Sequence, residues 1–198
     1  DIDVDGTTNL DVVDIDGAVD MASTLTIGGA INGVTIKADT TNFINSILIS
    51  QNASTGTLSS ADNNTGLGDS VFAALTSGTQ NIAIGQSAGL SLTEGIRNTI
   101  VGALAADAMT DADNNEAFGY GALSSNVLGS RSTAIGTAAL LTQNPSTATN
   151  MYNVAVGYEA GLSISTGTAN TLVGGLAGDA ITTGGNNVSV GYNSLSAN

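Results

Sequence analysis

One arrangement of apolar and polar positions recurs every 17 residues through the last two thirds of the chain. Each unit places an apolar residue at its fourth position, glycine at its fifth and a small residue at its eighth. The first position is Asn in seven of eight units, at Asn64, Asn81, Asn98, Asn115, Asn153, Asn170 and Asn187. The fifth-position glycines are Gly68, Gly85, Gly102, Gly119, Gly136, Gly157, Gly174 and Gly191. Because units that stack as equivalents must have equal length, the pattern predicts a rod of about eight coils over residues 64–198.

A 17-residue unit is long enough for short strands joined by turns, whereas a helical repeat needs about twice that length. The alternation in Asn-x-Ala-Val-Gly predicts a strand, and we expect its β-branched fourth residue to point inward and its third outward. The Asn side chains should stack along the rod and bond to one another. The glycine allows a positive φ or a close approach of two backbones. The predicted fold class is all-β, a parallel β-solenoid (β-roll) shaft.

One unit is longer than the others. Gly136 and Gly157 stand farther apart than any other neighbouring pair of fifth-position glycines. The unit at 132–152 therefore holds four additional residues, which we place at Gln143-Asn144-Pro145-Ser146. A coil cannot lengthen without expelling the excess, so this stretch should bulge outward. An irregular loop on a rigid scaffold is a common place for recognition, although loops also arise by neutral insertion. The candidate recognition residues are Asn144, Pro145, Met151 and Tyr152.

The shaft also contains a longer repeat. Residues 81–114 match residues 153–186 at 18 of 34 positions. The offset between the two segments equals four regular coils plus the four additional residues. The shaft therefore grew by duplication of blocks of coils.

The first sixty residues follow a different pattern. The stretches 2–6, 13–17 and 25–29 each alternate apolar residues with polar ones and end in glycine, at nearly equal intervals that are shorter than a coil. Short units of this kind cannot bury their own apolar side chains, so we expect strands of neighbouring chains to complete the core. We divide the chain into an acidic β-repeat stem at 1–36, which the resemblance described below implies is trimeric, a junction at 37–63 and the solenoid at 64–198.

Composition narrows the function classes. The chain has a net charge of −14, with seven acids in the first twenty residues, which argues against nucleic acid and anionic membranes as partners. No apolar run is long enough to span a bilayer. Cysteine and histidine are absent, which excludes the usual catalytic triads and zinc sites. Asp1, Asp3 and Asp5 imitate the start of a calcium loop, but Val12 occupies the place of its bidentate acid, so an ordinary strand is favoured. We predict no enzyme, no metal site and no cofactor.

Three tyrosines share the sixth position of their coils, at Tyr120, Tyr158 and Tyr192. Such a file could stack on sugars, but two-coil spacing of roughly 9 to 10 Å is too wide for one continuous platform. Packing at a rim or at a subunit contact is the favoured interpretation.

The sequences Asn81-Ile-Ala-Ile-Gly85, Asn153-Val-Ala-Val-Gly-Tyr158 and Asn187-Val-Ser-Val-Gly-Tyr192 resemble two related groups of repeats. One is the head repeat of trimeric autotransporter adhesins. The other, closer in period, is the Asn-Thr-Ala-Val-Gly-Tyr repeat of bacteriophage tail fibres. The resemblance covers residues 64–198 and implies an elongated homotrimer.

Three functions follow as hypotheses. The first is a structural fibre protein of a virion appendage, a phage tail fibre shaft that spaces and presents elements for host attachment. Its expected partners are two further copies, neighbouring fibre or baseplate proteins, and a host surface glycan or protein. The second hypothesis is a trimeric adhesin on a bacterial cell surface. The third is a polysaccharide-cleaving solenoid, which needs a cleft of acids.

Overall fold

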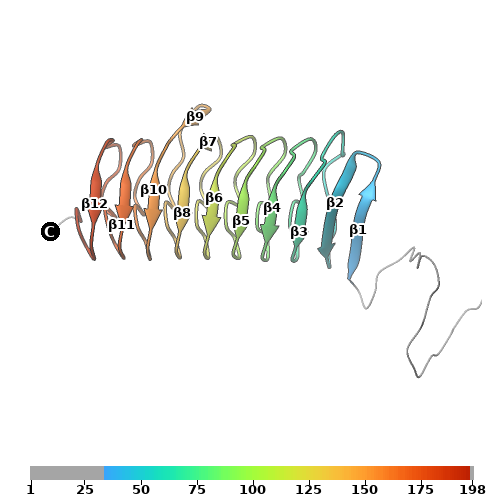
Figure 1. The fold of residues 1–198 in the computed structure, drawn as a ribbon, viewed down its shortest axis with the longest axis horizontal. Helices are drawn as coiled ribbons and strands as arrows, with labels where there is room; N and C mark the ends of the chain where they lie inside the picture. The colour runs from blue at the N-terminus through green and yellow to red at the C-terminus, as the bar shows by residue number, and fades with distance from the viewer. Residues whose placement is uncertain (1–33, 197–198) are drawn as a thin grey trace, which may run out of the picture.

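A computed structural model describes residues 34–196 of the chain. Within that range the protein is all-β, and its strands stack side by side into a solenoid of about eight turns (Figure 1). The predicted β-solenoid is therefore confirmed. The acidic stem predicted at 1–36 lies almost entirely outside the described residues, as do the candidate acids at Asp1, Asp3 and Asp5.

The main sheet has ten strands and is parallel except at its first pair. It begins with a hairpin of β1 (Thr35–Thr40) and β2 (Phe43–Ser50). The coil strands that follow are β3 (Thr65–Leu67), β4 (Ile82–Ile84), β5 (Thr99–Val101), β6 (Glu116–Phe118), β8 (Thr133–Ile135), β10 (Val154–Val156), β11 (Thr171–Val173) and β12 (Val188–Val190). A separate two-stranded sheet pairs β7 (Gly129–Ser130) with β9 (Thr149–Asn150).

The stretch predicted as a junction contributes a strand to the shaft. β2 pairs in parallel with β3, with Ile47 opposite Thr65 and Ile49 opposite Leu67. Ser46 occupies the place of the leading Asn, because its hydroxyl accepts a hydrogen bond from the backbone N–H of Asn64 at 2.8 Å. The chain from Ser46 onward is therefore already coil-like, with Ser in place of Asn.

The expected direction of the strand side chains is wrong. Counting the leading Asn as position 1, position 3 faces the core, as at Ala83, Ile100 and Leu172, which are fully buried. Position 4, predicted to point inward, faces outward, and Ile84 is 38% exposed. The inside of the coil is thin, so it accepts the smaller residue of each alternating pair, and most position-3 residues are Ala, Gly or Ser.

The side chains at positions 3 and 9 fill the core with complementary sizes. Gly66 is combined with Phe72 in its coil, and Ile100 with Ala106, so a large residue at one position accompanies a small one at the other. Where both positions are small, a neighbouring coil supplies the missing volume. A Cβ added at Gly161 would lie 2.8 Å from Leu172 Cδ1, so Leu172 fills the space that this glycine leaves. Positions 8 and 12 complete the core with small and medium apolar residues.

Candidate functional site

The leading Asn residues form a buried ladder along the shaft, as predicted. In each regular coil the Asn Oδ1 accepts hydrogen bonds from both the backbone N–H and the Nδ2 of the next Asn. For Asn81 and Asn98 these distances are 2.9 and 3.1 Å. Asn98 Nδ2 also donates to the carbonyl of Ala112 at 2.8 Å. Because all of these polar atoms are bonded, the ladder can occupy the centre of a thin core without a desolvation penalty.

The ladder is interrupted at Ser132, and Gln143 closes the gap. The hydroxyl of Ser132 donates to Gln143 Oε1 at 3.1 Å, and Asn153 Nδ2 donates to the same oxygen at 2.9 Å. Gln143 is fully buried at position 12, so its placement in the outward bulge is wrong. Its Nε2 donates to Asn126, which is also buried at position 12 of the coil before. A buried pair of amides thus replaces the apolar residues found there in other coils.

The fifth-position glycines bring neighbouring coils into direct backbone contact. Gly102 has a φ of +136°, and a Cβ added to it would lie 2.4 Å from the carbonyl oxygen of Gly119. Equivalent contacts recur from coil to coil, which confirms both a positive φ and a close approach. From Gly68 to Gly174, any side chain at these positions would force two coils apart.

The enlarged coil projects from the shaft at β9, as expected (Figure 1). The structure divides the four candidate recognition residues. Asn144 and Tyr152 are exposed, whereas Pro145 and Met151 are buried. Met151 packs below the loop, where its Cγ lies near Gly129. Exposure was therefore predicted correctly for Asn144 and Tyr152 and wrongly for Pro145 and Met151.

At the base of this loop Arg131 contacts two uncharged side chains, a cluster that the sequence pattern did not predict. Arg131 Nε donates a hydrogen bond to Asn150 Oδ1 at 3.0 Å. The guanidinium carbon of Arg131 also lies 5.9 Å from the centre of the Tyr152 ring, a cation–π distance. Only the recurrence of a basic residue at the ends of coils, at Arg97 and Arg131, signalled this cluster in the sequence.

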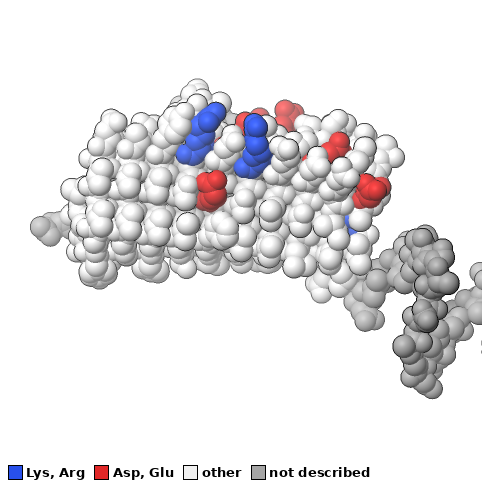
Figure 2. Space-filling model, viewed as in Figure 1, with Lys and Arg blue, Asp and Glu red and all other residues white. Residues whose placement is uncertain are grey.

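The outward face of the main sheet carries an unbroken apolar file. Every one of its ten strands contributes one aliphatic or aromatic side chain at the same register. We call these residues the apolar file: Ile36, Ile49, Leu67, Ile84, Val101, Phe118, Ile135, Val156, Val173 and Val190. Glu116 is the one charged residue on the outward positions of β3–β6, β8 and β10–β12. In Figure 2 most charged side chains of the visible face lie in its upper half, and the lower half is nearly free of charge.

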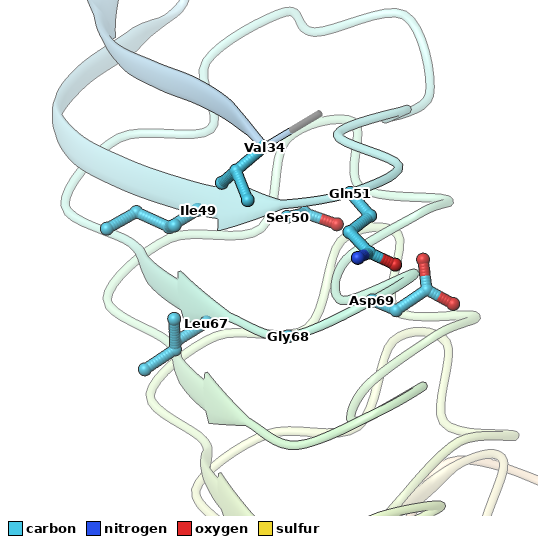
Figure 3. A pocket seen from close by; sticks show the side chains of 7 residues that line it. All are labelled: Val34, Ile49, Ser50, Gln51, Leu67, Gly68 and Asp69. Carbon is cyan, nitrogen blue, oxygen red and sulfur yellow. The ribbon is translucent and has the colours of Figure 1, made fainter. Parts of the chain in front are cut away.

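A hollow of about 280 Å³ lies beside the start of this file (Figure 3). Val34, Ile49 and Leu67 form its apolar side, and Gln51 and Asp69 stand at the opposite side. A single carboxylate without a second acid or a base offers no pair for general acid and base catalysis. The hollow is a widening of the outward sheet face and continues the apolar file.

The three tyrosines at position 6 are all more than half exposed, so they line the outside of the shaft. The Glu159 carboxylate accepts a hydrogen bond from the hydroxyl of Tyr158 and repels its ionised form, which raises the pKa of Tyr158. Among residues 34–196 no three potential metal ligands of the His, Cys, Asp or Glu type come together. The same residues contain no helix that could cross a bilayer.

No family model, no curated protein and no solved structure matches this chain. The likeness of its repeats to fibre repeats thus remains an expectation from the sequence. The ladder, the glycine contacts and the apolar file are the observations on which a function can be argued.

Proposed function

We propose that this chain is the shaft of a fibre in a virion appendage, in which three copies lie side by side and bury the apolar file between them. The shaft acts as a stiff spacer and has no catalytic role. The apolar file is the observation that carries this proposal, because each of the ten strands of the main sheet leaves an apolar side chain partly or largely exposed within residues 34–196.

The extent of the file suits a stable interface. Half-exposed aliphatic side chains contribute on the order of 60 to 80 Å² each, so the file and its neighbouring strand positions offer roughly 1,000 Å² per chain. A stable interface of standard size needs about 800 Å² per partner. The file is long and narrow, which favours chains that run alongside one another.

Charge also favours burial of this face. The chain has a net charge of −14, yet the outward positions of β3–β6, β8 and β10–β12 carry Glu116 alone, and its carboxylate accepts a hydrogen bond from Thr133 at 2.9 Å. Identical copies would otherwise repel one another. The face that is nearly free of charge is therefore the one on which copies can meet. Three copies, and a virion as their location, are what the tail fibre resemblance implies.

The mass of the native assembly tests the proposal. We expect three times the 19.4 kDa chain mass by light scattering or native mass spectrometry. Ile84→Glu, in the middle of the apolar file, should shift the assembly to single chains at micromolar concentration, because each copy would bury an unpaired charge.

Gln86→Glu is the matched control, since it adds the same charge two residues away, off the strand, at an exposed position. It should leave the assembly intact. Far-UV circular dichroism of Ile84→Glu should match that of the parent chain, because Ile84 is not part of the core. A folded parent chain that remains a monomer, or an Ile84→Glu assembly as stable as that of the control, would contradict the proposal.

A further inference from the structure

Two of the three basic residues in the chain lie on one short file. The last residue of each coil has a left-handed backbone and directly precedes the buried first residue of the next coil, an Asn or, after Arg131, Ser132. In four successive coils these residues are Arg97, Asn114, Arg131 and Tyr152, with φ between +52° and +63°. The shared conformation directs the four side chains to the same edge of the shaft. We call these four residues the Arg97–Tyr152 rim.

The rim is short and discrete. Neighbouring coils are about 4.8 Å apart, so four successive residues span roughly 14 Å, the length of two or three sugar rings. The file before and after the rim consists of uncharged residues, among them Gln80 and Ala169. Figure 2 shows two basic side chains close together at the upper edge of the visible face, beside the raised loop.

Arg131 is held in place by uncharged groups. Its Nε is bonded to Asn150, and its guanidinium lies over the Tyr152 ring. Neither partner neutralises the charge, and the terminal nitrogens of the guanidinium remain suited to a bidentate contact with an oxyanion. A side chain fixed in advance loses less entropy on binding than a mobile one.

The carboxylates of Asp113 and Glu116, in the same coils, make hydrogen bonds to groups other than the two arginines. Asp113 Oδ1 accepts a hydrogen bond from the backbone N–H of Ile96 at 2.8 Å, and Glu116 is bonded to Thr133. The rest of the chain is acidic, but its charges act over a Debye length of only about 8 Å at physiological salt. The Asp113 and Glu116 carboxylates keep their charge, so the rim holds an oxyanion through direct contact with the two guanidinium groups and not through a positive potential of the surrounding surface.

We propose that the Arg97–Tyr152 rim binds an acidic saccharide, with a sugar carboxylate on Arg131 or Arg97 and a sugar ring against Tyr152. Tyr152 is 56% exposed, so its ring can stack on the apolar face of a sugar. Asn114 belongs to the rim and Asn150 lies beside it, bonded to Arg131, so both bring amides near the place for sugar hydroxyls. The biological role of the site, host attachment, rests on the fibre proposal and names the class of receptor.

Binding can be measured on the full chain with a panel of immobilised oligosaccharides. The panel contains uronate, sialate and neutral oligomers, with methyl-esterified uronates as carboxylate-blocked controls. We expect retention on at least one carboxylate class, loss of retention on its ester or neutral counterpart, and weakening by added sodium chloride.

Arg131→Gln should weaken retention about tenfold or more, because a charge-assisted bidentate contact is lost. Arg97→Gln should weaken it several-fold and does not involve the contacts that hold the loop, so it separates ligand binding from loop support. Tyr152→Ala should also weaken it several-fold. Lys37→Gln is the matched control: it removes the same charge from β1, where Lys37 donates to Thr55, and should change retention less than twofold.

Retention that is equal on acidic and neutral oligomers, or that is unchanged in both arginine variants, would overturn the site. The assembly mass of the same samples is measured in parallel. If the chain is a trimer that binds no acidic saccharide, the proposed site is wrong and the fibre proposal stands. If the chain is a monomer that binds acidic saccharide through the rim, the fibre proposal is wrong and the proposed site stands.

Discussion

The interior of the coils and the outward face of the main sheet use polar and apolar side chains differently. The interior holds a polar ladder beside its apolar core, and the Asn81 and Asn98 of this ladder are buried with their amides bonded. The outer face carries the apolar file, in which Ile84 and Val101 lie at the surface. Each of these Asn residues directly precedes a strand, and the residue of the apolar file ends that strand.

This contrast shows that stacking, and not polarity, decides what a thin coil can bury. An Asn fits the inside because the coil above and the coil below satisfy its amide at a fixed spacing. The aliphatic residue that ends each strand has no such partner in its own coil and points outward, as Ile84 does. The inner face therefore holds one chain together, and the outer face is available to join chains.

The largest expected loss of stability follows from disturbing the backbone contact between the fifth-position glycines of neighbouring coils. Gly102→Ala places a Cβ 2.4 Å from the carbonyl oxygen of Gly119 at a φ of +136°, so we expect a loss of roughly 4 kcal/mol or more. Gly191→Ala is the control, because its φ is +123° but the new Cβ meets nothing within 4 Å. It should cost about 1 to 3 kcal/mol from backbone strain alone. Urea unfolding followed by circular dichroism at one protein concentration measures both, and equal losses would show that coil contact contributes nothing.

A smaller loss is expected when the inner ladder is cut. Asn98→Ala leaves the buried backbone N–H of Asn115 and the carbonyl of Ala112 without their side-chain partner, which should cost about 3 to 5 kcal/mol. Asn63→Gly replaces an exposed Asn with a φ of +61° and should change stability by less than about 0.5 kcal/mol. The same unfolding measurement compares them. A cost for Asn98→Ala as small as that of Asn63→Gly would contradict an energetic role for the ladder.

The smallest effect on stability is expected at the last residue of a coil, which directly precedes the buried Asn of the next coil. Ala169 adopts a φ of +58°, which is unfavourable for a residue with a Cβ. Ala169→Gly should therefore stabilise the chain by about 0.5 to 1 kcal/mol, visible as a raised melting temperature. Ala180→Gly, at an exposed position without a positive φ, should give no gain or a slight loss. A gain in both variants would show that Ala169 is not strained.

The period of the sequence was sufficient to predict the elements that depend on stacking. A constant interval predicts coils, Asn at the head of each coil predicts a ladder, and glycine at position 5 predicts a close contact. These features repeat identically, so the strict spacing of Asn and Gly in the sequence reveals them directly. The loop at the long interval was predicted for the same reason.

The period could not indicate which side of the strand is buried. Alternation has the same form whether the core lies on one face or on the other, and both faces here contain apolar residues. The signal lay in size, because Ala83, Ala117 and Ala134 at position 3 suit a thin core better than the larger residues beside them. Gln143 was misplaced because the number of additional residues does not say which of them leave the stack. Its polar neighbour at position 12, Asn126, was the available clue.

The complementary side-chain sizes at positions 3 and 9 limit how such a protein can change length in evolution. Leu172 of one coil fills the space beside Gly161 of the coil before it, so neither coil is a self-sufficient module. Deletion of one 17-residue unit would place two large residues against each other or leave a void. The four-coil offset between the matching segments 81–114 and 153–186 preserves each combination of large and small residues. We therefore expect variants of this shaft to differ in length by whole blocks of coils.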